Sequence, residues 1–310
     1  METKAKMEYQ VIHRRRRRLY LSLAGCALTF ILLCWWIIPP VWQLRDGPIE
    51  VIRWPKSGEQ LFLIGPGQEH WVSIEKVSLH VLHAIVVAED ARFYQHHGLD
   101  FREIRNSIEI NLEKKAYVRG ASTITQQVIK MAFLSQEKTI LRKLKEAVGS
   151  LLAEYLLEKQ DILEWYINLV EFGDGVFGIK EAAIHYFDTE PELLTIQQGA
   201  NLALVLPSPN NWSAGLRRKQ LTAFGHRRYS KIIEQMFLQG FITKTLRDSA
   251  LATGDFGRPI QLDLPQEEAI QVEEPQTPPT NIETDEEALL QSTTPETQEE
   301  EAPILSSEPN

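Results

Sequence analysis

Two short polar segments combine carboxylates, hydroxyls and amides in a way that suits proton transfer on a hydroxylated ligand. The first is EDARFYQHHG, from Glu89 to Gly98, which places two acids, two histidines and aromatic residues before a glycine. The second is RGASTITQQ, from Arg119 to Gln127, in which small hydroxyl residues precede two glutamines. A carboxylate can move a proton, and hydroxyls and amides can hold ring oxygens. Together the segments are typical of a site that handles sugars.

Glu89 is the leading candidate for a general base, and Asp90 is its alternative. Neighbouring residues on a helix point about 100° apart, so only one of these carboxylates can face a given cleft. On local grounds, an acidic pair at a helix end is more often a solvated surface. His96 and His97 are also adjacent, which aims their rings apart, and no third ligand shows suitable spacing. We therefore expect a packed or hydrogen-bonded histidine and no metal site.

A basic segment downstream contains a further acid. In RKLKE, Arg142 and Glu146 are four residues apart and share one face of a helix, and Lys145 lies between them. Lys130 and Lys138 precede this segment. The local interpretation is a surface salt bridge. The functional interpretation is a cradle for a diphosphate with a carboxylate at its edge, because arginine and lysine form charge-assisted bonds to phosphate oxygens.

A third cluster, KQDILEWYINLVEFGDGVFG, runs from Lys159 to Gly178. Glu164, Tyr166 and Asn168 mix polar and aromatic groups along one predicted helix. Taken locally, this is a capped core helix followed by a glycine-rich turn.

Helical periodicity accounts for most of the elements that must position these residues. Pro39, Pro40 and Pro55 interrupt it early and predict a connector over 43–70. Pro207 and Pro209 interrupt it again, and no convincing alternating strand appears in the body, so the fold class is mostly α. The expected helices cover residues 78–88, 101–115, 122–134, 140–158, 162–170, 179–187, 195–206, 217–241 and 243–252.

The N-terminal segment predicts a membrane anchor. Residues 1–18 end in the cluster Arg14–Arg18, and residues 19–38 carry no charge. Twenty helical residues span about 30 Å, the thickness of a bilayer core. Tryptophans at 35, 36 and 42 suit the far interface, so we expect a transmembrane helix within 19–42, a cytoplasmic N-terminus and an extracytoplasmic body. The alternatives are a cleaved signal peptide and, at Leu23-Ala24-Gly25-Cys26, a lipoprotein processing site.

Charge divides the chain into a basic body and an acidic tail. Residues 261–310 hold 14 of the 42 acidic residues and no lysine or arginine, which leaves 28 acids against 33 bases, a net charge of +5, for residues 1–260. A basic body suggests anionic partners. The tail, 258–310, is rich in Glu, Gln, Pro, Thr and Ser, and we expect it to be disordered. Both cysteines lie in the apolar N-terminal segment, so disulfides do not hold the body together.

Four of these segments, EDARFYQHHG, GASTITQQ, RKLKE and ILEWYIN, resemble the motifs of the family 51 glycosyltransferases in order and spacing. The runs from Asn168 to Ala183 and from Leu202 to Trp212 also resemble that family of bacterial peptidoglycan glycosyltransferases. The resemblance covers about residues 70–235, within an expected catalytic domain at 71–257. With an anchor and no second large domain, the chain looks like the monofunctional biosynthetic transglycosylases of the family.

The resemblance implies a lysozyme-like, mostly α domain behind a single transmembrane helix. It implies polymerisation of lipid II at the outer face of the inner membrane, with the glycan on undecaprenyl diphosphate as donor. Glu89 would be the general base that deprotonates the acceptor 4-hydroxyl, and Glu146 would support the donor site. Substrate-binding residues would be Ser122, Thr123, Thr125, Gln126, Gln127, Lys130, Lys138, Arg142 and Lys145.

Partners and alternatives follow from the same motifs. Lipid II and the bilayer are expected partners, and other cell-wall synthesis or division proteins are further candidates. Nucleic acid is not an expected partner, and Mg²⁺ is an optional aid at the diphosphate. Met131 and Lys138 depart from the family's usual Asn and Arg. A bifunctional penicillin-binding protein would need a Lys-Thr-Gly motif, which the sequence lacks. A lytic enzyme of similar fold and an inactive membrane-tethered scaffold are the remaining alternatives.

Overall fold

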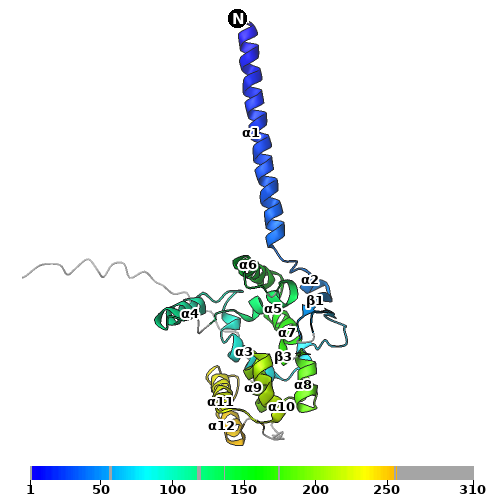
Figure 1. The fold of residues 1–310 in the computed structure, drawn as a ribbon, viewed down its shortest axis with the longest axis vertical. Coiled ribbons are helices and arrows are strands. Elements are labelled where there is room, and N and C mark those ends of the chain that lie inside the picture. The colour runs from blue at the N-terminus through cyan, green and yellow to red at the C-terminus, as the bar shows by residue number, and fades with distance from the viewer. Residues whose placement is uncertain are drawn as a thin grey trace, which may run out of the picture. The chain divides into compact units, whose positions relative to one another are not determined.

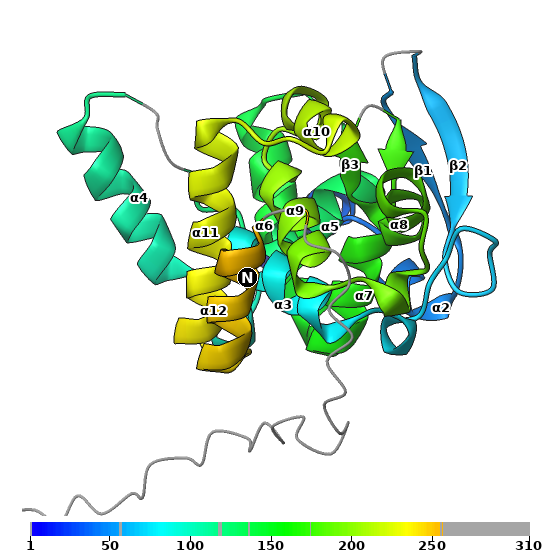
Figure 2. The ribbon, with the colours of Figure 1, turned by 90° about the horizontal axis from the view of Figure 1, so that it is seen from below.

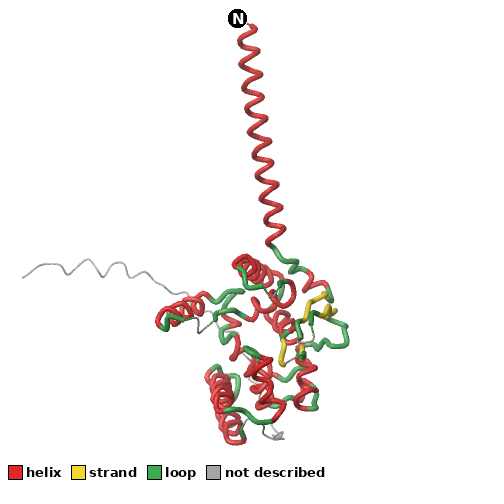
Figure 3. Tube along the Cα trace, viewed as in Figure 1, coloured by secondary structure: helices red, strands yellow, loops and turns green. Residues whose placement is uncertain are grey.

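The computed structural model describes residues 2–55, 58–116, 120–135, 137–173, 175–254 and 256. For residues 2–14 and 30–34 it describes the backbone alone. Helices dominate these residues (Figures 1 and 3), which confirms the mostly α fold class. The tail that we expect to be disordered, 258–310, lies outside the described residues, and so does Arg119 at the start of the second polar segment.

The described elements are helices and two small antiparallel sheets of two strands each. The strands are β1 (Ile49–Arg53) with β2 (Gln60–Ile64), and β3 (Glu171–Gly173) with β4 (Val176–Phe177). Short 3₁₀ helices cover Ile74–Lys76, Phe93–Gln95 and Pro191–Leu193. The α-helices are α1 (Glu2–Ile37), α2 (Gln43–Asp46), α3 (Leu79–Glu89), α4 (Phe101–Glu113), α5 (Ile124–Phe133), α6 (Ile140–Leu156), α7 (Lys159–Leu169), α8 (Ile179–Phe187), α9 (Ile196–Val205), α10 (Pro209–Arg218), α11 (Ala223–Leu238) and α12 (Lys244–Thr253).

Helix α3 lies at the centre of the domain, packed against α9 and α11 (Figure 2). It is apolar nearly all round, which is typical of a buried helix, and Ala84 and Ile85 are fully buried. Gly199 lets α9 approach closely, because a Cβ there would lie 3.0 Å from the Cα of Val81. A second group forms where α5 packs against both α6 and α7. Hydrogen bonds from Ile124 to Asp90 and from Gln127 to Glu89 join the C-terminal end of α3 to α5.

Two sequence-based expectations about secondary structure are wrong. The predicted helix over 217–241 is two helices, because α10 ends before Lys219, whose φ of 51° is left-handed, and Thr222 then caps α11. Pro209 begins α10 at a position where proline is favoured, and no helix was expected there. Strands were also unexpected, yet β1 and β2 form a hairpin inside the predicted connector, with Val51 and Ile64 buried.

The segment after α1 is packed onto the domain. Val41 and Leu44 are buried, and the indole Nε1 of Trp165 on α7 donates a 2.9 Å hydrogen bond to the Leu44 carbonyl. Gly149 on α6 makes room for Pro39, since a Cβ at Gly149 would lie 2.6 Å from the Pro39 Cγ. The residues that connect α1 to the sheet are therefore held by α6 and α7.

Helix α1 includes the apolar segment for which an anchor was expected. Within the part of the chain that the structure describes, no helix combines the length and hydropathy needed to cross a membrane. The side chains of 30–34, in the middle of the expected span, are outside that part.

Candidate active site

Glu89 is the last residue of α3, and its half-buried carboxylate faces α5. The Nε2 of Gln127 donates a 2.9 Å hydrogen bond to its Oε2. Burial is the largest influence on Glu89 and raises the pKa of its carboxyl, and the nearby charge of Asp90 adds to the rise. The hydrogen bond from Gln127 lowers this pKa, as do the charges of Arg228 and Lys130. A carboxylate poised in this way suits proton removal near neutral pH.

Asp90, the alternative base, has a structural role in the domain. It is the C-cap residue that follows α3, it is buried, and its Oδ2 accepts a 3.0 Å hydrogen bond from the backbone N of Ile124, the first residue of α5. His96 Nε2 lies 3.0 Å from both oxygens of the same carboxylate. These bonds tie the end of α3 to the start of α5 and so set Glu89 opposite Gln127.

Asp90, His96 and Asp100 form the one group among the described residues that brings metal-type ligand atoms within 4.8 Å of one another. Asp100 already accepts from two backbone N–H groups in the first turn of α4 and from Arg92 at 3.1 Å. A guanidinium so close opposes a cation, so these residues do not fit a resident metal ion. His96 is buried and hydrogen-bonded, as expected, while His97 is exposed.

The hydroxyl-rich motif divides into framework and surface residues. Thr123 and Gln126 form a capping box at the start of α5, and the Thr123 hydroxyl donates to the Gly98 carbonyl at 2.6 Å. Thr125 is fully buried and donates to Glu154 Oε1 on α6 at 2.5 Å. Ser122 is exposed, and Gln127 is half-buried and bonded to Glu89.

Glu146 is the centre of the basic cluster on α6. Its carboxylate is 3 % exposed and accepts from Arg142 Nη1 at 2.5 Å and from Lys143 Nζ. Lys143 Nζ also donates to the Ser122 hydroxyl at 2.9 Å. This arrangement confirms the predicted Arg142–Glu146 pair and joins α6 to the start of the hydroxyl-rich motif.

Lys130 connects the two acids electrostatically from α5. Burial lowers the pKa of its ammonium, and the carboxylates of Glu146 and Glu89 act in the opposite direction. Arg142 and Lys143 lower it further by repulsion. One basic group therefore interacts electrostatically with both the candidate base and the cationic cluster.

Two of the lysines predicted to bind substrate, Lys145 and Lys138, are not bonded to Glu146 in the described part of the chain. The Nζ of Lys145 is 4.3 Å from the ring centroid of Trp36 in a cation–π contact and is not among the partners of Glu146. Lys138 is exposed in the turn before α6. Of the two lysines in RKLKE, Lys143 is the one that bonds Glu146, although it is not among the predicted substrate-binding residues. Its i,i+3 spacing from Glu146 was the available signal.

Two further residues reach the site from distant parts of the chain. Arg228 on α11 interacts electrostatically with Glu89, while its Nε donates to the Leu204 carbonyl at 3.1 Å and its guanidinium lies 5.1 Å from the Trp212 ring centroid. Tyr166 on α7 is fully buried, and its hydroxyl lies 3.5 Å from Gln127 Oε1. No local sequence signal identifies either contact, because each depends on helix packing.

The other polar residues of the third cluster are structural. Glu164 accepts from Trp71 Nε1 at 3.1 Å and from the backbone N of Ile74 at 2.8 Å. Asn168 is fully buried and bonds both backbone groups of Val72. These contacts hold the segment before α3 onto α7, which agrees with the local interpretation of a core helix.

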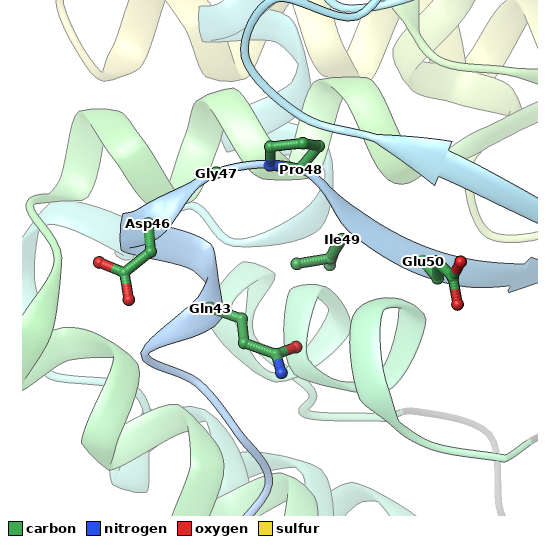
Figure 4. A pocket seen from close by; sticks show the side chains of 6 residues that line it. All are labelled: Gln43, Asp46, Gly47, Pro48, Ile49 and Glu50. Carbon is green, nitrogen blue, oxygen red and sulfur yellow. The ribbon is translucent and has the colours of Figure 1, made fainter.

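A surface cavity of about 520 Å³ lies away from these residues, beside α2 and the start of β1 (Figure 4). It is lined by Gln43, Asp46, Gly47, Pro48, Ile49 and Glu50. None of the predicted site residues is in this lining. Its two carboxylates and its amide, without a cationic side chain in that set, do not suit a phosphate ligand.

Comparison with known proteins gives a consistent result. A family model described as Transglycosylase matches residues 58–237. A protein of Dechloromonas aromatica named biosynthetic peptidoglycan transglycosylase is 35 % identical over 222 residues, 68 % of this chain and 94 % of that protein. Proteins of the same name from Chromobacterium violaceum, 36 % identical over 66 % of this chain and 93 % of their own, and Rhodospirillum centenum, 38 % identical over 66 % and 84 %, are also similar.

Proposed function

The chain belongs to the transglycosylase family and is a peptidoglycan glycosyltransferase, and from this premise we propose that it polymerises lipid II with Glu89 as general base. Glu89 removes the proton from the 4-hydroxyl of the acceptor sugar. The resulting nucleophile attacks the anomeric carbon of a glycan held on undecaprenyl diphosphate, and the diphosphate leaves from the opposite face. The bond that forms is glycosidic, and the configuration at the anomeric carbon inverts.

The observation that carries this proposal is the environment of Glu89. Its carboxylate is half-buried, its pKa is raised by burial, and Gln127 holds one oxygen at 2.9 Å. A raised pKa makes the carboxylate a stronger base, and the hydrogen bond fixes its direction. Asp90, which follows it directly, is buried and bonded to the Ile124 backbone N–H and to His96 Nε2, so we assign it to the framework.

The cationic cluster on α6 suits the departing diphosphate. We propose that Arg142, Lys143 and Lys130 hold its oxygens, because cations aimed at developing negative charge stabilise the transition state. Buried Glu146 keeps the first two of these groups in place. Mg²⁺, when bound at the diphosphate, would supply additional positive charge there. The exposed hydroxyl of Ser122 and the amide of Gln127 are the groups of the hydroxyl-rich motif that we assign to substrate contact.

The remaining residues of that motif act indirectly in this proposal. The side chains of Thr123, Thr125 and Gln126 are buried in bonds to their surroundings, so we assign them to holding α5 in register with α3 and α6. Lys138, exposed before α6, would meet substrate only at the outer edge of the site.

We also propose that the enzyme works at the outer face of the inner membrane, anchored through residues 19–42. The uncharged run and its flanking arginines and tryptophans support this assignment. A substrate with a long polyprenyl chain stays in the bilayer, so an anchored enzyme meets it without a search through solution. Other cell-wall synthesis proteins are natural partners at that place.

An assay of the detergent-solubilised full chain on labelled lipid II tests the function directly. Parent, Glu89→Gln and Glu234→Gln are compared with and without Mg²⁺, and products are separated by size and treated with a muramidase. Glu234 is a matched control because it pairs with Arg247 between α11 and α12. We expect long muramidase-sensitive chains from the parent and the control, and none from Glu89→Gln despite retained lipid II binding. Residual polymerisation by Glu89→Gln within tenfold of the parent would remove Glu89 from the base role.

A further inference from the structure

Three helices meet in a short hydrogen-bonded relay that ends on the candidate base. The hydroxyl of Tyr166 on α7 donates to Gln127 Oε1 on α5 at 3.5 Å. The Nε2 of the same amide donates to Glu89 Oε2 on α3 at 2.9 Å. Gln127 is thus bonded at both ends of its amide by groups that lie far apart in the sequence.

Tyr166 has the properties of a fixed donor. Its side chain is fully buried, and α7 packs directly against α5. Burial, with the charges of Glu89 and Asp90, raises the pKa of its phenol well above 10, so the hydroxyl keeps its proton. A protonated phenol donates its O–H to the carbonyl oxygen of an amide. A reversed amide could donate an N–H to the phenol oxygen, but the buried O–H would then lose Gln127 Oε1, its acceptor among the described residues. Contact with this hydroxyl therefore selects one of the two orientations of the Gln127 amide.

The selected orientation matters because the two ends of an amide act oppositely on a carboxylate. With Oε1 toward Tyr166, the NH₂ group points at Glu89 and stabilises the ionised form. With the amide reversed, a carbonyl oxygen would face the carboxylate and repel it. The ionised form is the one that can accept a proton from an acceptor hydroxyl.

We propose that Tyr166 is a positioning residue of the glycosyl-transfer site, which orients the Gln127 amide so that it donates to Glu89. This inference rests on the proposed role of Glu89 as general base. Tyr166 itself touches no reacting atom in this scheme. Its effect reaches the base only through Gln127.

The other groups around Glu89 are independent of this relay. Asp90 follows it as the C-cap of α3, Lys130 extends from α5, and Arg228 extends from α11. None of them is bonded to the Gln127 amide in the described part of the chain. Loss of the phenol oxygen should therefore change the orientation of one amide and leave these charges where they are.

Tyr166→Phe tests the proposal because it removes the oxygen and keeps the ring. The matched control is Tyr186→Phe, which removes another phenol oxygen that bonds a backbone carbonyl, at Phe172, 3.1 Å away. Gln127→Met and the double variant Tyr166→Phe/Gln127→Met complete a cycle. For each full-length variant, kcat/KM on lipid II is measured from pH 5 to 9.

We expect the acidic limb of the pH profile to move to higher pH in Tyr166→Phe, with a loss of roughly threefold to tenfold at pH 6 that recovers above pH 8. The double variant should match Gln127→Met alone, because Tyr166 then has no amide to orient. The limb of Tyr186→Phe should coincide with that of the parent. An unshifted limb in Tyr166→Phe, or additive losses in the double variant, would overturn the proposal.

A second readout separates this inference from the proposed function. Carbon-13 NMR of side-chain-labelled glutamate, with the Glu89 signal assigned by its loss in Glu89→Gln, gives the pKa of that carboxyl without any turnover. Tyr166→Phe should raise it. A raised pKa together with an active Glu89→Gln would keep the relay and discard the general base, whereas an unchanged pKa with an inactive Glu89→Gln would discard the relay alone.

Discussion

Lys143 and Lys145 stand two positions apart on α6, and their ammonium groups have different partners. Lys143 Nζ bonds Glu146 and the Ser122 hydroxyl, whereas Lys145 Nζ lies 4.3 Å from the ring centroid of Trp36. Side chains separated by two residues on a helix point to different faces. The ammonium group of Lys143 therefore lies among the polar groups around Glu146, and that of Lys145 lies beside the end of α1.

This division predicts opposite outcomes for two otherwise identical substitutions. Lys143→Met should lower kcat/KM for lipid II by roughly tenfold to a hundredfold, because a charge-assisted bond to the diphosphate is lost. Lys145→Met serves as its control and should change the rate less than about threefold when measured with a short-chain, water-soluble substrate. Equal losses in the two variants would contradict the assignment.

Arg228 is predicted to keep Glu89 ionised. Its charge lowers the pKa of the Glu89 carboxyl, so Arg228→Gln should raise that pKa and move the acidic limb of kcat/KM to higher pH. The rate at pH 6 should fall more than the rate at pH 8. Arg247→Gln is the control, since Arg247 also lies against an aromatic ring, Phe237 at 4.4 Å, but pairs with Glu234. A uniform loss at every pH would assign Arg228 to packing alone.

Gly149 is predicted to tolerate no side chain. A Cβ there would lie 2.6 Å from the Pro39 Cγ and 2.7 Å from the Ile129 Cγ2, so Gly149→Ala should lower the free energy of unfolding by about 1–3 kcal/mol. Denaturant unfolding followed by circular dichroism measures the change. Adding Pro39→Ala removes one of the two clashing atoms and should restore part of the loss. Full stability of Gly149→Ala would show that the segment before α2 is not held against α6.

The domain is predicted to lose stability on mild acidification because of His83. Burial is the main cause, with the charge of His80 adding to it, and together they lower the pKa of His83 from 6.5 to about 4. Between those pH values the unfolded chain binds a proton that the folded domain does not, so the free energy of unfolding falls as pH falls from 6.5 to 4. The loss across this whole pH window should be about 3 kcal/mol.

His83→Phe isolates this contribution. The ring of His83 stacks on Phe241 with centroids 4.1 Å apart, and phenylalanine preserves that stacking. Thermal unfolding of the variant should depend less on pH across this window than that of the parent. His185→Phe, at an exposed position, should leave the pH dependence as it is in the parent. An unchanged slope in His83→Phe would contradict the prediction.

Sequence motifs predict Glu89 and Gln127 as candidate site residues, and they predict the Arg142–Glu146 pair that the structure contains, because each combines a residue type with a short spacing. The direction in which a buried side chain points cannot be predicted from its own motif. Thr125 lies in the same motif as Gln127, yet it bonds Glu154 because α6 runs along that side of α5. Nothing within the octet indicates this, since the partner comes from another helix.

Long-range contacts explain the other differences between expectation and structure. Arg228 and Tyr166 reach Glu89 only through the packing of α11 on α3 and of α7 on α5. The β1–β2 hairpin was missed because its strands are short and stand next to prolines. The hairpin is stabilised by the core beneath Val51 and Ile64 more than by a strong local strand pattern.

The close fit of Pro39 against Gly149, together with the bond from Trp165 to Leu44, makes the exit of the chain toward α1 a stiff joint. Prolines at 39 and 40 remove two soft backbone rotations at this point. A force or torque applied to α1 would therefore be transmitted to α6 and α7 and not dissipated in a flexible linker. Arg142 and Lys143 also lie on α6. A change in the direction of α1 relative to the domain would therefore also change the position of the cationic cluster.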